Sequence, residues 1–343
     1  MKYLLLTGTA GFIGSNFVKY FLEKYEEYCL INLDLLTYAG DKDNLLSFFD
    51  DPRFIFIKGD ICNRKLVEDI FSKYEIHGVI HFAAESHVDN SIKFPDVFIR
   101  TNINGTFTLL DVAYKTWFEK PFKYYKKYEK ARFHHISTDE VYGSLGENGL
   151  FTEKTPYAPN SPYSASKASS DMIVRSYYKT YGLNCVITNC SNNYGPNQHK
   201  EKFIPTIIRK ALEGNQIPIY GNGTNIRDWL YVEDHCTGID VVFHKGEKGE
   251  TYNIGGNNEK TNNEIVDVIL TILDSKVPPL ERIGKDSYKE LAHFVEDRAG
   301  HDERYAIDSS KIENELGWKP KESFESAILK TVDYNINKLR CSK

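Results

Sequence analysis

Hydrophobic residues in the first half of the chain fall into short continuous runs, separated by longer segments in which they recur with a helical period. Short apolar runs without alternation are typical of strands that are buried on both faces of a sheet. They predict strands at Lys2–Thr7, Cys29–Asp34, Phe54–Lys58, Gly78–Ala83, Ala131–Ser137 and Cys185–Cys190. The segments between them predict helices at Phe12–Lys24, Lys65–Lys73, Val97–Phe118 and Tyr163–Tyr181. This alternation predicts an α/β fold with a Rossmann-like, doubly wound parallel sheet.

The pattern changes after about Tyr194, where proline and glycine become frequent and the apolar runs shorten. Helical periods remain at Asn262–Leu273, Ser309–Leu316 and Phe324–Leu339. We therefore expect a dinucleotide-binding domain over residues 1–193. Residues 194–343 would form mainly a smaller mixed α/β substrate lobe, with some later segments returning to the first domain.

The composition limits the kinds of molecule that we expect the chain to bind. Of the 343 residues, 41% are hydrophobic and 27% are charged, which is ordinary for a globular protein. The net charge of −5 gives no general attraction to nucleic acid or to an anionic membrane. No apolar stretch approaches the roughly 18 residues of a membrane span, and the N-terminal run is too short for a signal peptide. We expect neither a nucleic-acid partner nor a membrane partner.

The six cysteines show no spacing of the kind that zinc sites use. Most lie in apolar runs, where a thiol behaves as a small hydrophobic group, so a reduced, cytoplasmic setting and no metal site are expected. His134 and His135 are interpreted as core residues of a strand, because no second cluster of ligands accompanies them. The lysine-rich segment Lys115–Lys130 is interpreted as a solvated insertion rather than a nucleic-acid-binding surface.

Three glycines, Gly8, Gly11 and Gly14, follow the first predicted strand and open the first helix. The first two permit a tight turn and close approach to a pyrophosphate, and the third lets the helix pack closely on the sheet. Asp34 ends the second strand, where a carboxylate binds ribose hydroxyls and repels a 2′-phosphate. The pattern predicts NAD rather than NADP. Asp60, after the third strand, is equally consistent with an adenine contact and with a helix N-cap.

Tyr163 and Lys167 lie at the start of the helix predicted at Tyr163–Tyr181. A spacing of four residues places both side chains on one face of the helix. The lysine ammonium and a positive nicotinamide ring would both favour the phenolate form of the tyrosine, which can then act as a base. Such a pair is common by chance, but downstream of the glycine turn it indicates hydride-transfer chemistry.

Thr138, Asp139 and Glu140 lie at the carboxyl end of a predicted central strand, where ligands bind in sheets of this class. Thr138 is placed to hydrogen-bond a substrate hydroxyl together with Tyr163. A single acid at a strand end is commonly a cap, but two adjacent acids beside a buried strand are costly to keep charged. Paired carboxyl groups with split pKa values supply an acid and a base, and we favour this catalytic interpretation.

These residues resemble the extended short-chain dehydrogenase/reductase superfamily. More narrowly, the segment Ser-Thr-Asp-Glu-Val-Tyr-Gly at 137–143 is similar to the dTDP-glucose 4,6-dehydratases. Further segments with the same similarity are His81–Asp89, Cys190–Pro196, Ile226–Asp234 and Glu296–Asp302. The similarity extends along almost the whole chain, to Trp318, and related epimerases and decarboxylases lack the Thr-Asp-Glu run.

The resemblance implies that dTDP-glucose is converted to dTDP-4-keto-6-deoxyglucose and water, with NAD regenerated in each cycle. Tyr163 would take the proton of the sugar 4-hydroxyl while hydride leaves C4. Glu140 would then remove the C5 proton as general base, and Asp139 would protonate the leaving 6-hydroxyl as general acid. The resemblance also implies a role in deoxysugar biosynthesis, such as that of rhamnose. A homodimer is expected too, because the helices at Val97–Phe118 and Tyr163–Tyr181 carry apolar residues on more than one face.

Binding residues follow from the same resemblance, motif by motif. The glucosyl part would be contacted by Ser86, Thr138 and Asn192, with Glu201 and Lys202 matching the family's Glu-Lys pair. The nucleobase would lie against Pro218, Ile219 and Tyr220, and the diphosphate and its ribose against Arg227, Asn262 and Arg298, with His301 as a further substrate contact. The expected NAD contacts are Gly8, Gly11, Phe12, Ile13, Gly14, Asp34, Thr37, Asp60, Ile61, Ala83, Ala84, Thr101, Tyr163, Lys167 and Asn193. Any of the arginines is equally consistent with an ion pair between the lobes.

The chain departs from the family pattern at three places. Asn189 stands where arginine is expected, Ala299 replaces a proline, and residues 197–200 replace an aromatic-rich tetrapeptide. None of these touches the proposed acid, base or tyrosine, so they bear on affinity and substrate fit rather than on the type of reaction.

Alternative functions remain open at this point. A UDP-glucose 4,6-dehydratase differs only in the base and ribose that it recognises. A sugar-nucleotide 4-epimerase has no use for an acid–base pair at C5 and C6, so Asp139 and Glu140 argue against it. A non-catalytic dinucleotide-binding protein would not need Tyr163 and Lys167 together with both acids.

Overall fold

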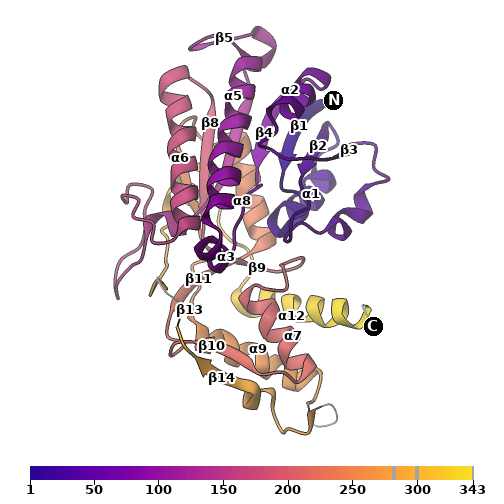
Figure 1. The fold of residues 1–343 in the computed structure, drawn as a ribbon, viewed down its shortest axis with the longest axis vertical. Helices are drawn as coiled ribbons and strands as arrows, with labels where there is room; N and C mark the ends of the chain where they lie inside the picture. The colour runs from indigo at the N-terminus through magenta and orange to yellow at the C-terminus, as the bar shows by residue number, and fades with distance from the viewer. Residues whose placement is uncertain (280–282, 298–300, 342–343) are drawn as a thin grey trace.

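A seven-stranded parallel sheet forms the centre of the computed structural model, which describes residues 1–279, 283–297 and 301–341. The strand order is β12-β8-β7-β4-β1-β2-β3 (Figure 1). The strands are β1 (Lys2–Thr7), β2 (Tyr28–Asp34), β3 (Phe54–Lys58), β4 (Ile76–His81), β7 (Arg132–Thr138), β8 (Cys185–Cys190) and β12 (Thr251–Ile254). All six predicted strands are present, each within two residues of its predicted bounds, and the Rossmann-like fold is confirmed.

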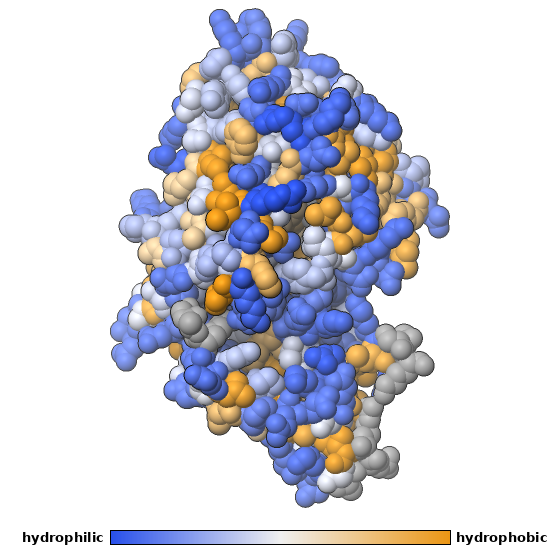
Figure 2. All heavy atoms as spheres, viewed as in Figure 1, coloured by the Kyte–Doolittle hydropathy of each residue, from blue (hydrophilic) through white to orange (hydrophobic). Residues whose placement is uncertain are grey.

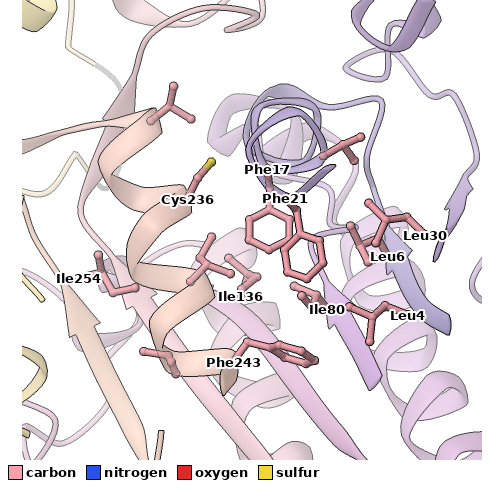
Figure 3. Close-up of a cluster of buried hydrophobic side chains, with 14 of the residues drawn as sticks. Leu4, Leu6, Phe17, Phe21, Leu30, Ile80, Ile136, Cys236, Phe243 and Ile254 are labelled. Atoms are coloured by element: carbon pink, nitrogen blue, oxygen red, sulfur yellow. The ribbon is translucent and has the colours of Figure 1, made fainter. Parts of the chain in front are cut away.

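Helices cover both faces of this sheet. On one face, α1 (Phe12–Lys24) and α8 (Val232–Lys245) pack side by side over the strands. Figure 3 shows Phe17 and Phe21 of α1 and Phe243 of α8 meeting aliphatic side chains of the sheet. The opposite face is covered by α2 (Arg64–Lys73), α5 (Thr106–Trp117) and α6 (Pro162–Tyr181). Because both faces are buried, the strands need the continuous apolar runs that predicted them.

The long helix predicted at Val97–Phe118 is not a regular α-helix. It is built from α4 (Pro95–Phe98), a π-helical segment η2 (Ile99–Gly105) and α5, preceded by α3 (Val88–Lys93). Within η2 the buried Asn102 accepts a hydrogen bond from the Glu85 amide and donates one to the Ser166 hydroxyl. These contacts lie far apart in sequence, so a periodic apolar pattern could not reveal the wider turn.

The chain returns to the main sheet after residue 194. β12 pairs with β8, and α8 packs against α1. α11 (Ser310–Leu316) adds Ile312 to the same core.

A smaller lobe lies below the sheet in Figure 1 and has its own apolar core. It contains α7 (Phe203–Glu213), α9 (Asn262–Lys276), α12 (Phe324–Cys341) and the parallel pair β10 (Ile217–Tyr220) and β14 (Ala292–Val295). A further sheet of β9 (Asn192–Tyr194), β11 (Ile226–Tyr231) and β13 (Glu259–Thr261) connects the lobe to the main body. The predicted helices at 262, 309 and 324 are confirmed, and two of them extend two or three residues further.

The lysine-rich segment forms a short hairpin of β5 (Phe118–Lys120) and β6 (Lys123–Tyr124). β5 lies at the end of the molecule opposite the smaller lobe (Figure 1). Its lysines are exposed to solvent, as expected of a solvated insertion. Among the described residues, no helix is both long and apolar enough to cross a membrane.

Candidate active site

One cavity opens at the carboxyl ends of the parallel strands and brings the predicted residues together. All five predicted catalytic residues line it, and so do all the predicted NAD contacts. They come from the segments that follow β1, β2, β3, β4, β7 and β8, and from η2 and α6. Since the carboxyl ends of parallel strands share one edge of a sheet, ligands bind there in this fold class.

The glycine turn after β1 is shaped for a phosphate group. Gly8 has a positive φ of 72°, and a Cβ atom on it would lie 2.6 Å from Ala83 Cα of the neighbouring strand segment. A Cβ on Gly14 would lie 2.5 Å from the Gly8 carbonyl oxygen. Gly11 is the N-cap of α1 and provides no side-chain cap, so the first amides of the helix remain open to an anion. The backbone therefore fits the pyrophosphate of a dinucleotide.

Asp34 is fixed beside this turn by two backbone hydrogen bonds. Its carboxylate accepts from the Ala10 amide and from the Leu36 amide, both at 2.8 Å. Burial raises the pKa of Asp34, while these two hydrogen bonds act in the opposite direction. The side chain lines the cavity, and its contact with a ribose stays a prediction.

Asp60 is not a helix N-cap, so that alternative is wrong. The cap of α2 is Asn63, whose side chain accepts from the Leu66 amide. Asp60 accepts instead from the Cys62 amide at 2.8 Å and pairs with the Arg100 guanidinium at 2.5 Å. Asp60 lines the cavity, so its contact with the adenine stays a prediction.

Tyr163 and Lys167 lie in the first two turns of α6. A capping box between Ser161 and Ser164 begins the helix, so the two functional side chains are fixed relative to the sheet. The Lys167 ammonium donates to the Ile136 carbonyl at 2.8 Å, and burial lowers the pKa of Lys167 to about 8. Burial and the charge of Glu140 raise the pKa of Tyr163 well above its usual value. The chain alone therefore holds Tyr163 as a neutral phenol, although the lysine was expected to favour the phenolate.

The acidic pair follows β7 in a short 3-10 turn, η4 (Asp139–Tyr142). The cap of this turn is Thr138, whose hydroxyl accepts from the Glu140 amide at 3.3 Å, so neither acid serves as the cap. Asp139 is only 1% exposed. Burial raises the pKa of Asp139 well above its usual value, and the charges of Glu140 and Asp228 raise it further. These surroundings favour the protonated form of Asp139.

Four predicted substrate residues line the same cavity: Ser86, Thr138, Asn192 and Lys202. The Lys202 ammonium donates to the Ser86 carbonyl at 2.9 Å and joins two of the loops around the cavity. Glu201 lies beside this group, with its carboxylate 3.7 Å from His199 Nδ1.

The remaining substrate residues lie in the smaller lobe and do not line the cavity, in the part of the chain that the structure describes. On β10, Tyr220 is 40% exposed, whereas Ile219 is 4% exposed and belongs to the core of the lobe. Arg227, on β11, donates to the carbonyl oxygens of Asp302 and Glu303.

Pro218, also on β10, is partly buried, and the other three predicted substrate residues lie in separate segments. Asn262 is the first residue of α9, and the ring of His301 lies 2.7 Å from Asp297. Arg298 falls outside the described residues, as does Ala299.

Sequence reasoning missed several residues that line the cavity. Tyr38 and His199 make an edge-to-face contact with ring centroids 5.7 Å apart, and Gln198 donates to the Asn193 carbonyl. These residues lie in loops, where no periodic pattern marks a direction. The only signal was that residues 197–200 depart from the family pattern.

His134 has the structural role that was predicted. It is buried, contacts the Thr188 hydroxyl at 3.1 Å and stacks on Phe243. Its neighbour His135 contacts two ionisable groups of α6. Within the described ranges, no group of three or more His, Cys, Asp and Glu side chains is arranged to hold a metal ion.

Comparison with known proteins gives a consistent result. The sequence model of the GDP-mannose 4,6 dehydratase family matches residues 5–331. The dTDP-glucose 4,6-dehydratase of Neisseria gonorrhoeae is 51% identical over 341 residues, which cover 99% of this chain and 97% of that protein.

Two solved structures are also similar along their whole length. The dTDP-glucose 4,6-dehydratase of Bacillus anthracis in complex with NAD has a TM-score of 0.85 and 48% identity, with 99% of this chain and 98% of that chain covered. The dTDP-glucose 4,6-dehydratase of Streptomyces venezuelae with NAD and TYD bound has a TM-score of 0.88 and 43% identity, with the same coverage.

Proposed function

The chain belongs to the dTDP-glucose 4,6-dehydratases of the extended short-chain dehydrogenase/reductase superfamily, and from this premise we propose how its residues divide the reaction. The protein is an NAD-dependent lyase that converts dTDP-glucose to dTDP-4-keto-6-deoxyglucose and water. When bound, NAD supplies the acceptor for the C4 hydride and returns that hydride to C6. In each of the other steps, a side chain of the protein takes a proton from a defined substrate atom or gives one to it.

Tyr163 is the base of the first step. Its phenolic oxygen takes the proton of the 4-hydroxyl, with Thr138 positioning that hydroxyl from the end of β7. The chain holds Tyr163 neutral through burial and the charge of Glu140, so a positive charge is required nearby for the phenolate to form. Lys167, four residues along the same face of α6, carries one such charge below its pKa of about 8, and the nicotinamide ring of bound NAD would supply a second.

The acidic pair carries out the elimination. This proposal rests mainly on the electrostatic surroundings of Asp139. Asp139 is buried between the charges of Glu140 and Asp228, which favours its protonated form. It can therefore donate a proton to the leaving 6-hydroxyl. Glu140 removes the C5 proton, which the 4-ketone has made acidic. Two adjacent carboxyl groups in different environments thus supply the acid and the base of one elimination.

The substrate lies between the two parts of the chain in this proposal. Residues 1–193 hold NAD, with Asp34 at the adenosine ribose and Asp60 at the adenine. Residues 194–343 mainly hold the sugar nucleotide. Ser86, Thr138 and Asn192 contact the glucosyl part, and Glu201 and Lys202 are further substrate contacts. The nucleotide part contacts Pro218, Ile219, Tyr220, Arg227, Asn262, Arg298 and His301. Because Ile219 lies in the core of the lobe, its contact with the base would come from its backbone.

An assay of product formation tests the function. The protein is incubated with dTDP-glucose, and the ultraviolet absorbance that alkali induces in a 4-keto sugar is measured. We expect a ketone from dTDP-glucose and much less from UDP-glucose in parallel. Ketone from UDP-glucose alone would select the alternative nucleotide, and a galactosyl product would select an epimerase. No ketone from either sugar would refute the dehydratase assignment.

We also propose that two copies of the chain form a homodimer through the face of α3, α4, η2, α5 and α6. Large apolar side chains are exposed on these elements, and Figure 2 shows apolar residues over α5 and α6. Such patches on a protein surface mark interaction sites. The residues are Ile92, Phe94, Val97, Ile99, Phe107 and Met172.

A reducing compartment, the cytoplasm, fits the free thiols of the described cysteines. The 4-keto-6-deoxy product would feed deoxysugar biosynthesis such as that of rhamnose.

A further inference from the structure

A buried cluster of ionisable side chains lies behind Lys167. Asp171 follows Lys167 by four residues, on the same face of α6, and is 1% exposed. His135 of β7 is fully buried beside both residues. Neither Asp171 nor His135 lines the active-site cavity, and the reaction as described above uses neither of them.

The three groups meet at one nitrogen atom. His135 Nε2 lies 3.5 Å from the Lys167 ammonium and 3.2 Å from Asp171 Oδ1. The other carboxylate oxygen, Oδ2, accepts from the Ser137 hydroxyl and the Tyr157 hydroxyl, each at 2.9 Å. Asp171 is therefore held in one orientation, with its first oxygen facing the imidazole that separates it from Lys167.

The charges in this cluster are closely balanced. Burial lowers the pKa of Lys167 to about 8, and the charge of Asp171 counteracts that effect. Burial raises the pKa of Asp171 to about 7, while the charge of Lys167 and the two hydroxyl groups lower it. The pKa of His135 lies well below its usual value because of its burial and the charge of Lys167, so its ring stays neutral. The neutral ring can accept a hydrogen bond from Lys167 or donate one to Asp171, according to its tautomer.

We propose that Asp171, acting with the imidazole of His135, is a positioning residue that holds Lys167 in its ammonium form beside Tyr163. A buried ammonium loses its proton readily unless an opposite charge lies close by. The carboxylate supplies that charge from one helical turn further along the same face of α6, outside the residues that line the cavity. The inference rests on the proposed roles of Tyr163 and Lys167, and it adds a residue that touches neither substrate nor cofactor.

Other titratable groups around the cluster do not replace this carboxylate. His81 of β4 has its ring 5.2 Å from that of His135 and is neutral through burial. Cys190 of β8 and Tyr142 of η4 have pKa values raised by burial, so both are neutral at physiological pH. Tyr157 donates to Asp171 and is also neutral. Asp171 is thus the anion that faces Lys167 from within this cluster.

The pH dependence of the first hydride step tests the proposal. Its rate is followed by the absorbance of reduced nicotinamide, which does not require elimination. Lys167 is charged below its pKa, so activity is lost as the pH rises through that value. Without the carboxylate, the alkaline limb of the profile should move to lower pH by about 1–3 units in Asp171→Asn, since a close opposite charge has an effect of this size. The loss should be large near pH 8 and small near pH 6.

Two control variants accompany this measurement. Asp171→Glu keeps the charge and should keep the alkaline limb close to that of the wild type. Tyr157→Phe removes one hydrogen bond to the same carboxylate, but the carboxylate stays ionised at alkaline pH. The alkaline limb of the pH profile of this variant should therefore not move. If Asp171→Asn is merely less stable, its rate falls equally at all pH values, and the proposal is refuted.

A third variant covers the case in which Asp171→Asn does not fold. His135→Gln removes the ring between Lys167 and Asp171, and its alkaline limb should move in the same direction by a smaller amount. An unchanged limb in His135→Gln would also refute the proposal. If the wild type carried out the first hydride step but formed no ketone, the proposed elimination would be contradicted. The pH profile of the first step would still test the role of Asp171.

Discussion

Asp139 and Glu140 are chemically similar neighbours whose environments separate their roles. Burial raises the pKa of Asp139, and the charges of two further acids raise it more, so its protonated form is favoured. Glu140 is only partly buried and lines the cavity from the same turn. The difference in burial between adjacent side chains is what allows one short turn to contain an acid and a base.

Replacing each acid separately should therefore stop the reaction at different points. Glu140→Gln should still produce reduced nicotinamide from dTDP-glucose but should not exchange the C5 proton with deuterated water. Asp139→Asn should allow that exchange and lose water at least about 100-fold more slowly, which is the usual contribution of a general acid. Nuclear magnetic resonance of the sugar follows the exchange. Loss of reduced nicotinamide in Glu140→Gln would contradict its assignment to C5.

Tyr163→Phe should be blocked before either acid acts. Without a phenolic oxygen to take the 4-hydroxyl proton, the formation of reduced nicotinamide should slow by about 100-fold or more. Binding of NAD, measured as the nicotinamide content of the purified protein, should change little. If the first step proceeded at the wild-type rate in this variant, Tyr163 would not be the base.

At the scale of elements, the turn between β1 and α1 depends on glycine for two reasons. Gly8 has a left-handed backbone conformation, and its Cα lies against the backbone of Ala83. The sequence suggested a tight turn and the close approach of a pyrophosphate. The structure shows that strand packing within the protein also requires a residue without Cβ.

Gly8→Ala should therefore lower both stability and NAD content. The strained φ alone costs about 1–3 kcal/mol in the free energy of unfolding, and the clash with Ala83 adds to it. Gly146→Ala is the matched control, because Gly146 is exposed and nothing lies within 4 Å of the added Cβ. Its free energy of unfolding should stay within about 0.5 kcal/mol of the wild type. Chemical denaturation measures both, and equal effects of the two substitutions would contradict this account.

The elements that the sequence predicted well are those in which buried apolar residues form a regular pattern along the chain. The strands β1, β3 and β8 and the helix α1 have the predicted bounds: β8 is buried along its whole length, β1 is buried over its last four residues, and α1 buries one face. The irregular segment η2 depends on hydrogen bonds of Asn102 to residues distant in sequence. The local pattern of apolar residues cannot predict these bonds.

The same distinction applies to the site. The glycine turn, the tyrosine–lysine pair and the acidic turn have local spacings that could be recognised, and all three line one cavity. The contact of His135 with Asp171 joins β7 to α6 and requires the three-dimensional structure. The loop residues Tyr38 and His199 were missed for this reason too.

At the scale of the whole molecule, the exposed apolar face of α3 to α6 should be covered by a second copy. Light scattering should give about twice the chain mass of 39.5 kDa for the wild type. Phe94→Asp combined with Ile99→Asp should shift the mass toward that of a single chain, since Phe94 is 62% exposed on this face. Phe122→Asp is the control, because Phe122 is 69% exposed on the hairpin at the far end of the molecule. A monomeric wild type would refute the dimer.

The whole arrangement, with a cavity at the edge of the sheet and a smaller lobe below it, accounts for a closed redox cycle with a net loss of water. Mass spectrometry of the product formed from dTDP-glucose in deuterated water tests this most directly. We predict a product that has lost one water molecule and gained one deuterium at C5, while the hydrogen from C4 has moved to C6. A product of unchanged mass, or one that has lost water without deuterium at C5, would contradict the account.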